Sequence, residues 1–441
     1  MKNEYPKIKY ANSGELSIAY QVWGDSDKVL VYVPGLVSHL EVTLEIFGYV
    51  DWLQNLSKNY KVIIFDKRGQ GMSDRETSMP GIEARADDIT AVVQAEGIKR
   101  FSLFGLSEGA AIALFYAASH PENVEAVAIL GGFSNVSNSK AYKLHSDEND
   151  VKNWITHWGE GLSGYSLCPH VMPQMQDVMA KFERMTCNPR TLGKMLDTNI
   201  AIDIRPVLPE IKVPTLVCHS RDDKRVPKEN GRYIAEHVRG AKYIEYAHGG
   251  HLPYFGLEMQ LAEDIDFFFQ KSSTMTQLKN KNIDRLATIL FTDIVDSTTK
   301  LSDFGDKKWS KILDKHDRCI QTLAKKFSGN FIKNTGDGAL LVFDGPIRAV
   351  NCAVEFSKAL NALGIEIRCG LHIGSIEWRG KDISGIAVNI TARVMDIDKG
   401  NNIIITKNLA NLISGSDIKL KDIGVHSLKG IEGNWSLLKV Y

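Results

Sequence analysis

A serine between two glycines follows a short apolar run in this 441-residue chain. The sequence FSLF leads into Gly105-Leu106-Ser107-Glu108-Gly109, and the helix-forming sequence AAIALFYAASH comes next. A G-x-S-x-G pattern between a strand and a helix makes a tight turn that exposes the serine hydroxyl above a sheet. Because this hydroxyl is a weak nucleophile at neutral pH, it needs a histidine base and an acid that orients the histidine.

Candidates for that acid and base occur later in the chain. Asp223 follows the apolar run PTLVC, and His251 follows KYIEY, so the order serine, acid, histidine is kept. Asp222 and His248 compete for the same roles. We favour Asp223 because it begins the sequence DKRVP, which matches the pattern D-x-x-V-P, and His251 because it precedes a turn at Leu-Pro-Tyr. The backbone N–H groups of Leu36 and Glu108 are expected to form the oxyanion hole.

The first 270 residues resemble the α/β-hydrolase superfamily in these motifs. The sequences VPGLVSHLE and FDKRGQGMSDR resemble those of hydrolase modules attached to bacterial nucleotide cyclases. One departure is Pro34-Gly35, where many hydrolases have His-Gly. The resemblance implies either an esterase-like enzyme that uses Ser107 or a domain with an intact triad that only senses a ligand.

Two carboxylates form a second set of candidate residues. Asp293 ends the apolar sequence LATILFTDI, and Asp337 lies 44 residues later in the turn TGDG. The elements around them are expected in the order β-α-β-β-α-β, which is the ferredoxin-like arrangement. The first strand of such a sheet lies between its neighbours, so both carboxylates can meet at its end. Two carboxylates on rigid backbone suit Mg²⁺ ions that also take substrate phosphates.

Four polar residues surround this pair in the sequence. Lys333 lies four residues before Asp337, and Asp382 precedes Asn389 and Arg393, which share one face of an expected helix at 385–397. Each alone has an ordinary explanation as a solvated helix charge, a turn former or a strand-edge lysine. Their joint presence with both carboxylates favours a site.

Residues 285–441 are similar in these positions to the class III nucleotidyl cyclases. The resemblance implies two metal ions (Mg²⁺ or Mn²⁺) on Asp293 and Asp337, a purine read by Lys333 and Asp382, a ribose oriented by Asn389, phosphorus contacted by Arg393 and, by a weaker match, triphosphate contacted by Lys429. It also implies a homodimer, because in this family the metal carboxylates and the base-reading pair of one site come from different chains.

The choice between adenine and guanine can be argued from the hydrogen-bonding groups of Lys333 and Asp382. Lysine only donates and an ionised aspartate only accepts, so the pair suits the N1 acceptor and N6 donor of adenine. Guanine presents the reverse pattern. The prediction is an adenylate cyclase that converts ATP to cyclic AMP and pyrophosphate. The alternatives are a guanylate cyclase and a serine hydrolase whose C-terminal domain only binds nucleotide.

Short apolar runs alternate with helix-like stretches up to residue 270, which predicts a mostly parallel sheet with helices on both faces. Residues 134–210 interrupt this alternation and carry Trp154, Trp158 and five of the 11 methionines, so we expect a helical lid over a small apolar or ester ligand. The expected organisation is an α/β-hydrolase domain at 1–270, an unperiodic polar linker at 271–283 and an α+β ferredoxin-like cyclase domain at 284–441.

Composition excludes several classes of protein. The chain has 53 basic and 53 acidic residues, so a general nucleic-acid or anionic-membrane binder is not expected. The first 20 residues contain no apolar h-region and no apolar run of about 18 residues occurs, so neither a signal peptide nor a membrane-spanning segment is expected. The six cysteines are scattered without a C-x-x-C pattern, so we expect free thiols in the cytoplasm rather than disulfides or a zinc site.

Overall fold

The computed structural model describes residues 5–75, 81–136, 148–163, 167, 174–276, 284–398 and 400–441. The chain divides into two compact units, Met1–Lys281 and Asn282–Tyr441. Among the described residues, no helix is both long enough and apolar enough to cross a membrane. The five cysteines within these ranges are free thiols, and Cys168 lies outside them.

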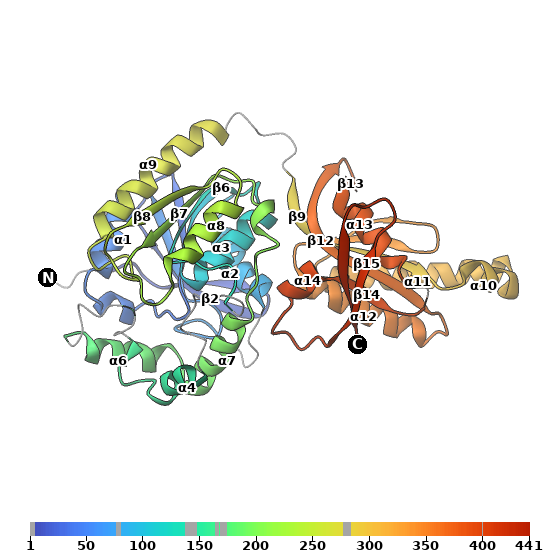
Figure 1. Cartoon of the computed structure of the whole chain (residues 1–441), viewed down its shortest axis with the longest axis horizontal. Coiled ribbons are helices and arrows are strands. Elements are labelled where there is room, and N and C mark those ends of the chain that lie inside the picture. Colours follow the sequence, from blue (N-terminus) through green and yellow to red (C-terminus); the bar gives the residue numbers. More distant parts are fainter. Residues whose placement is uncertain are drawn as a thin grey trace. The chain divides into compact units, whose positions relative to one another are not determined.

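The first unit is built on one eight-stranded sheet (Figure 1). Its strands are β1 (Lys9–Ser13), β2 (Leu16–Trp23), β3 (Val29–Val33), β4 (Lys61–Phe65), β5 (Phe101–Leu106), β6 (Val124–Leu130), β7 (Thr215–Ser220) and β8 (Lys242–Tyr246). The strand order is β1-β2-β4-β3-β5-β6-β7-β8. The pairs from β4 to β8 are parallel, as predicted, whereas β1 and β2 add an antiparallel edge that the sequence patterns did not indicate.

Helices cover both faces of this sheet. They are η1 (Val42–Glu45), α1 (Tyr49–Ser57), α2 (Ile82–Ala95), α3 (Glu108–Ser119), α4 (Glu148–Thr156), α6 (Gln176–Thr186), α7 (Pro189–Ile200), η3 (Leu208–Glu210), α8 (Lys228–His237) and α9 (Glu258–Thr276). Helix α1 packs against α9 through Trp52, Leu53 and Ile265, in one apolar cluster with sheet residues such as Phe104. Every residue of α3 is buried, which explains its continuous apolar sequence.

Helices α4, α6, α7 and η3 lie between β6 and β7, in the stretch where a lid was expected. Residues 137–147, 164–166 and 168–173 of that stretch are outside the described ranges. Trp158 packs with Leu192 and Leu196, and its indole nitrogen donates to the carbonyl oxygen of Cys187 at 2.8 Å. This tryptophan therefore belongs to the internal core of the insertion.

The second unit contains a sheet with the strand order β10-β11-β9-β12-β14-β16-β15, and β13 pairs with β12. The strands are β9 (Arg285–Ile294), β10 (Asn330–Asn334), β11 (Ala339–Phe343), β12 (Ile367–Arg379), β13 (Asp382–Ser384), β14 (Ile403–Thr406), β15 (Leu420–Ser427) and β16 (Asn434–Val440). The helices are α10 (Ser297–Phe304), α11 (Asp306–Lys326), α12 (Pro346–Asn361), α13 (Ile386–Met395) and α14 (Lys407–Leu412).

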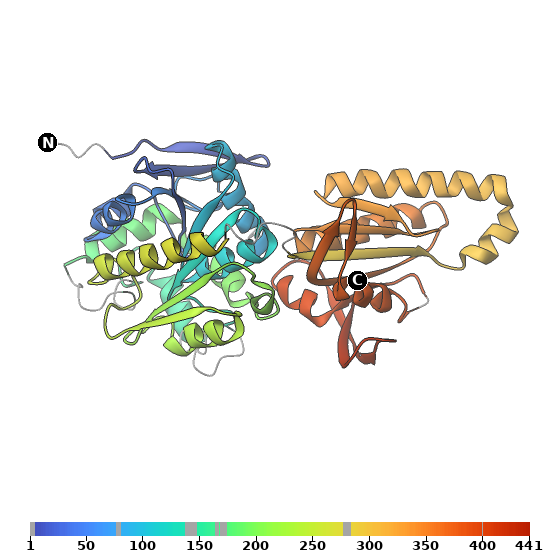
Figure 2. The ribbon, with the colours of Figure 1, turned by 90° about the horizontal axis from the view of Figure 1, so that it is seen from above.

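Strand β9 lies between β11 and β12, which is the position that the ferredoxin-like prediction requires. Ala287 and Ile289 of β9 pack with Ala387 of α13 on one face of the sheet. Figure 2 shows the long helix α11 beside the sheet, with α10 bent away from it at Gly305, whose φ is +72°. The sequence patterns indicated neither α10 and α14 nor the C-terminal hairpin of β15 and β16.

The predicted linker at 271–283 is wrong for its first six residues. Helix α9 continues to Thr276, and residues 277–283 lie outside the described ranges. Phe269 and Ser272 are both buried, and the Ser272 hydroxyl, which donates to the carbonyl oxygen of Phe268 at 2.8 Å, has a partner there. Burial of Ser272 is consistent with a helix that extends past residue 270 into a polar sequence.

The contact between β5 and α3 gives a stability prediction. A Cβ on Gly105 would lie 2.7 Å from Cα of Ala110, so the helix has to shift to admit it. We expect Gly105→Ala to lower the free energy of unfolding by about 2–3 kcal/mol, as overpacked cores do. The matched control is Gly97→Ala, whose Cβ meets nothing within 4 Å but sits at a φ of +68°, and which should cost only about 1 kcal/mol. Equal losses in urea unfolding would contradict this account of the turn.

Candidate active sites

Ser107 connects β5 to α3 in a strained turn. Its φ is +56°, a value that non-glycine residues rarely adopt and that clusters at functional sites. A Cβ on Gly109 would collide with the carbonyl groups of Val33 and Pro34, so the helix start needs a glycine there. The turn thus raises the serine hydroxyl at the carboxyl end of the central strands, where α/β sheets place their sites.

The candidate acid and base are already paired. Nδ1 of His251 lies 2.8 Å from Oδ2 of Asp223, and His251 is only 3% exposed. The backbone N–H groups of Arg225 and Val226 donate to the other oxygen of Asp223 at 2.8 and 2.9 Å, which fixes the carboxylate. The competing His248 is 90% exposed and lies 3.8 Å from Asp222. The geometry therefore favours His251 and Asp223.

Electrostatics keep the Asp223 carboxylate ionised. Burial opposes its charge, but the nearby His251 and the hydrogen bonds from His219 and His251 outweigh burial, so the pKa of Asp223 lies well below its ordinary value. An ionised partner holds the Nδ1–H tautomer of His251 and leaves Nε2 available to a hydroxyl.

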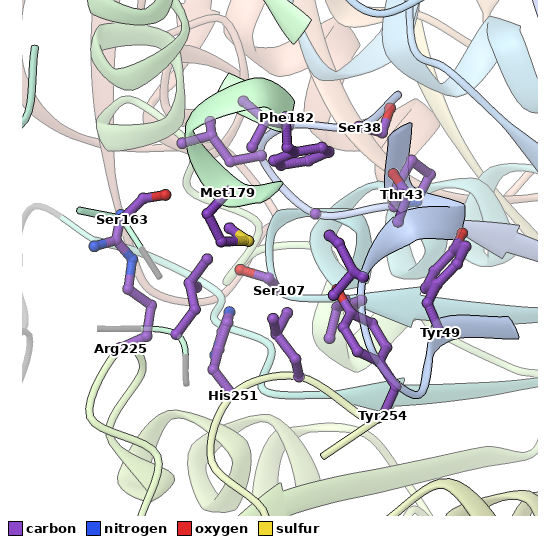
Figure 3. A pocket seen from close by; sticks show the side chains of 18 of the residues that line it. Ser38, Thr43, Tyr49, Ser107, Ser163, Met179, Phe182, Arg225, His251 and Tyr254 are labelled. Atoms are coloured by element: carbon purple, nitrogen blue, oxygen red, sulfur yellow. The ribbon is translucent and has the colours of Figure 1, made fainter. Parts of the chain in front are cut away.

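A pocket opens above the elbow (Figure 3). Figure 3 shows Ser107 and His251 next to each other in its wall, with Met179 and Phe182 of α6 on the side opposite His251. The described lining is largely apolar, and the cavity volume is about 90 Å³. Since a 150 Å³ engineered cavity holds one benzene, this space suits a short acyl group.

One of the two expected oxyanion donors lines this pocket, and the other directly follows Ser107. Leu36 lines it, and a Cβ on the preceding Gly35 would lie 3.3 Å from Cβ of Ser107. Glu108 is the first residue of α3, where backbone N–H groups have no partner inside the helix. Both peptide groups are therefore close to the serine, as an oxyanion hole requires.

In the second unit the structure brings Asp293 and Asp337 together. Asp293 is near the end of β9, and Asp337 is in the turn that joins β10 to β11. Burial raises the pKa of Asp293, the hydrogen bond from Arg368 lowers it, and the charge and hydrogen bond of Asp337 raise it, with a net increase above the ordinary value. The contact with Arg368 therefore does not fully offset the burial of Asp293 and the nearby Asp337 carboxylate.

Arg368 is a residue that the sequence analysis missed. It lies opposite Asp293 in the register of β9 and β12, and its Nη2 is 2.6 Å from Oδ2 of Asp293. Only strand pairing, which sequence spacing does not reveal, could have identified it. A guanidinium beside two carboxylates also suits the binding of a phosphate group.

The expected base-reading residues form a pair of their own. Nζ of Lys333 lies 2.5 Å from Oδ2 of Asp382, and this hydrogen bond lowers the pKa of Asp382. Asp382 pairs with Arg379 at the end of β12, whereas Asp293 pairs with Arg368 at its start. Asp382 and Asp293 are therefore next to opposite ends of β12.

The remaining candidates are exposed on the surface of this unit. Asn389 and Arg393 lie on the exposed face of α13, and Nη1 of Arg393 lies 3.3 Å from Oδ2 of the nearby Asp396. Lys429 is exposed between β15 and β16. Within one chain, none of these three has a contact with Asp293 or Asp337 among the hydrogen bonds and ion pairs of the described residues.

The residues present fit a divalent cation that also binds substrate. Within the described ranges, no three His, Cys, Asp or Glu side chains gather to form a closed metal cage. Two oxygen-bearing side chains on neighbouring backbone are what Mg²⁺ takes when substrate phosphates and water complete its shell.

Comparison with known proteins agrees with this division into a hydrolase-type unit and a nucleotide-site unit. The family model described as "alpha/beta hydrolase fold" matches residues 28–256, and the chain belongs to that family. The family model described as "Adenylate and Guanylate cyclase catalytic domain" matches residues 278–439, so the C-terminal unit is a nucleotide cyclase domain.

Individual relatives match one unit each. Human "Serine hydrolase BPHL" is 28% identical over 260 residues, covering 57% of this chain and 83% of that protein. "Putative adenylate cyclase 3" of Rhizobium meliloti (strain 1021) is 27% identical over 157 residues, 34% of this chain and only 27% of that protein. The esterase RhEst1 from Rhodococcus sp. ECU1013 shares the fold at a TM-score of 0.50 and 23% identity, covering 60% of this chain and 98% of its own.

The paired His251 gives a prediction for ester hydrolysis. We expect His251→Ala to lower kcat for p-nitrophenyl acetate by about 10²–10⁴-fold, the usual contribution of a general base. The matched control is His248→Ala, an exposed histidine three positions earlier, which should leave kcat unchanged. Loss of activity in the His248 variant instead would show that the base had been assigned to the wrong histidine.

Proposed function

We propose that the C-terminal unit is an adenylate cyclase that converts ATP to 3′,5′-cyclic AMP and pyrophosphate in a homodimer. The observation that supports it most is the gathering of Asp293, Asp337 and Arg368 at the end of the central strand β9. In the reaction the ribose 3′-oxygen bonds to the α-phosphorus, and the bond from that phosphorus to the β-phosphate oxygen breaks, releasing pyrophosphate and a proton.

Each residue in this unit then has a specific task. Asp293 and Asp337 would hold two Mg²⁺ or Mn²⁺ ions, which supply positive charge to the phosphates and lower the pKa of the 3′-hydroxyl. Arg368 and Lys429 would pair with phosphate oxygens, and Arg393 would donate to the oxygens on phosphorus as charge builds. Asn389, one helical turn from Arg393, would hydrogen-bond the ribose and keep its 3′-oxygen in line.

The contact of Lys333 with Asp382 supports adenine as the base. In the free chain each side chain satisfies the other, so the donor and acceptor already lie side by side. Adenine can take over both bonds, with N1 accepting from Lys333 and N6 donating to Asp382. Guanine at the same place sets donor against donor and acceptor against acceptor, which buried sites reject strongly.

The positions of these groups support a homodimer. Asp382 and Asp293 are at opposite ends of β12, and Asn389 and Arg393 are exposed on α13. A symmetric pair of chains can bring the carboxylates of one chain against the exposed groups of its partner, and a two-fold axis then generates two equal sites.

For the N-terminal unit we propose serine hydrolase activity on small esters with short acyl groups. The triad geometry and the apolar cavity of about 90 Å³ support it. If no ester is turned over, the same pocket serves as a ligand sensor. The free thiols at all five described cysteine positions fit the reducing cytoplasm.

Mixed dimers test the assignment of the two half-sites. Dimers purified with one Asp337→Ala chain and one Asn389→Ala chain, separated by two affinity tags, should keep about half of the wild-type cyclic AMP production, because one site remains intact. Each variant alone should be inactive. The control pairs Asp293→Ala with Asp337→Ala, which damages both sites and should give no activity. Inactive mixed dimers of the first kind would refute a site shared between chains.

The preference for adenine over guanine has a separate test. The wild-type kcat/KM for ATP should exceed that for GTP by at least about 10²-fold, because a mismatched polar group discriminates strongly once the partner chain shields the site from water. Asp382→Asn should narrow this ratio, since an amide both donates and accepts. Arg379→Gln alters the exposed neighbour of Asp382 in the hairpin and should leave the ratio unchanged. Comparable turnover of ATP and GTP by the wild-type chain would favour the guanylate or dual-substrate alternative.

A further inference from the structure

A lysine is buried beside the nucleophile turn and takes no part in the triad. Lys67 follows β4, and its side chain is only 1% exposed. Its Nζ donates to the carbonyl oxygen of Gly35 at 2.5 Å and to Oε2 of Glu108 at 2.9 Å. Arg85 pairs with the other oxygen of Glu108. A lysine is rarely buried this deeply without a partner, and here one of its partners is the loop that carries an expected oxyanion donor.

The bond to Gly35 has a consequence for the next residue. The carbonyl of Gly35 and the N–H of Leu36 belong to one peptide plane, in which a trans bond points the two groups in opposite directions. When Lys67 holds the Gly35 oxygen on one side, the N–H of Leu36 is directed to the other. Gly35 itself lies close to Ser107, so that peptide plane is beside the nucleophile.

Neighbours of Lys67 hold the rest of the same loop. Gln70 donates to the carbonyl oxygen of Leu36 at 3.2 Å and accepts from the N–H of Ser38 at 2.7 Å. Asp66 accepts from the N–H of Leu40 at 3.1 Å. The segment 66–70, the first part of the sequence DKRGQGMSDR, is therefore bonded to the segment 35–40 through the side chains of Asp66, Lys67 and Gln70, each of which is 2% exposed or less.

Glu108 links the two halves of the expected oxyanion hole. Its backbone N–H is the second donor, and its buried carboxylate holds Lys67, which in turn holds the peptide of the first donor. One ion pair thus connects both peptide groups. Hydrogen-bond donors that are fixed before charge develops on the substrate need no reorganisation during the reaction. This preorganisation accelerates the reaction.

We propose that Lys67 is a positioning residue that orients the Leu36 N–H toward the oxyanion, with Glu108 as its anchor. This inference rests on the hydrolase function proposed for Ser107. A hydrogen bond from a cation to a carbonyl also polarises the peptide and strengthens its N–H as a donor. The effect belongs to the transition state, so it acts on kcat more than on KM.

A neighbouring ion pair provides a matched control. Arg68, the next residue, bonds to Asp88 at 2.7 Å, and Asp88 is fully buried. The guanidinium also donates to the hydroxyl of Ser13, and these contacts lie outside the segment 35–40. Arg68→Met therefore breaks a pair of similar burial without releasing the Gly35 peptide.

The experiment uses the full chain with three variants, Lys67→Met, Lys67→Met/Glu108→Gln and Arg68→Met. For p-nitrophenyl acetate, Lys67→Met should lower kcat by about 10–100-fold with KM changed by less than about 3-fold, somewhat below the loss of a whole oxyanion donor. The double variant also takes the Glu108 carboxylate away from the buried Arg85, so it should lower the melting temperature further, with kcat no higher than in Lys67→Met. Arg68→Met should lower the melting temperature and keep kcat.

Amide hydrogen exchange of the segment 35–40 gives a readout that does not need turnover. In Lys67→Met the amide hydrogens of this segment should exchange at least about 3-fold faster than in the wild-type chain. In Arg68→Met their exchange rate should not change, because only Lys67→Met loses the bond to the Gly35 oxygen. Unchanged kcat and exchange in Lys67→Met, or equal losses of kcat in both single variants, would overturn the proposal. If the wild-type chain shows no Ser107-dependent turnover, the hydrolase function fails while the exchange comparison still decides the role of Lys67.

Discussion

The passage from β5 into α3 through a single residue at positive φ is the constraint on which the first unit depends. Ser107 adopts this conformation only because Gly105 and Gly109 let the helix lie directly on the strand and on the neighbouring loop. The same closeness brings the carbonyls of Val33 and Pro34 next to the helix start. Strain at the serine is therefore sustained by packing over the whole central sheet, as strained functional residues require.

The second unit relies on a central strand in the same way. Strand β9 is buried and bonded on both sides, so Asp293 near its end is held on rigid backbone. Its neighbours on either side then determine what surrounds the carboxylate: the β10–β11 turn contributes Asp337, and β12 contributes Arg368. Asp382 pairs with the far end of β12, away from Asp293, which is consistent with the proposal that each chain contributes two half-sites.

Local sequence predicted the parts of both sites that depend on short spacing. The elbow, the helix of Asn389 and Arg393, and the TGDG turn were found because strand, turn and helix signals lie within a few residues of one another. Lys67 and Arg368 were missed because only strand pairing and loop packing bring them to Glu108 and Asp293. The end of α9 was misjudged because the burial of Ser272 depends on packing, which the local polar sequence does not reveal.

A neutral chain can hold a polyanion if its cations change partners. Three cations of the proposed cyclase site are already paired in the free chain: Lys333 with Asp382, Arg368 with Asp293, and Arg393 with Asp396. None of them adds to an open positive field, in agreement with the equal counts of acidic and basic residues. Arg368 can exchange Asp293 for a phosphate once that carboxylate has another counter-ion, and Lys333 can exchange Asp382 for a ring nitrogen. Because each exchange requires a group of the right geometry, such a site selects its ligand by shape and hydrogen bonding rather than by charge.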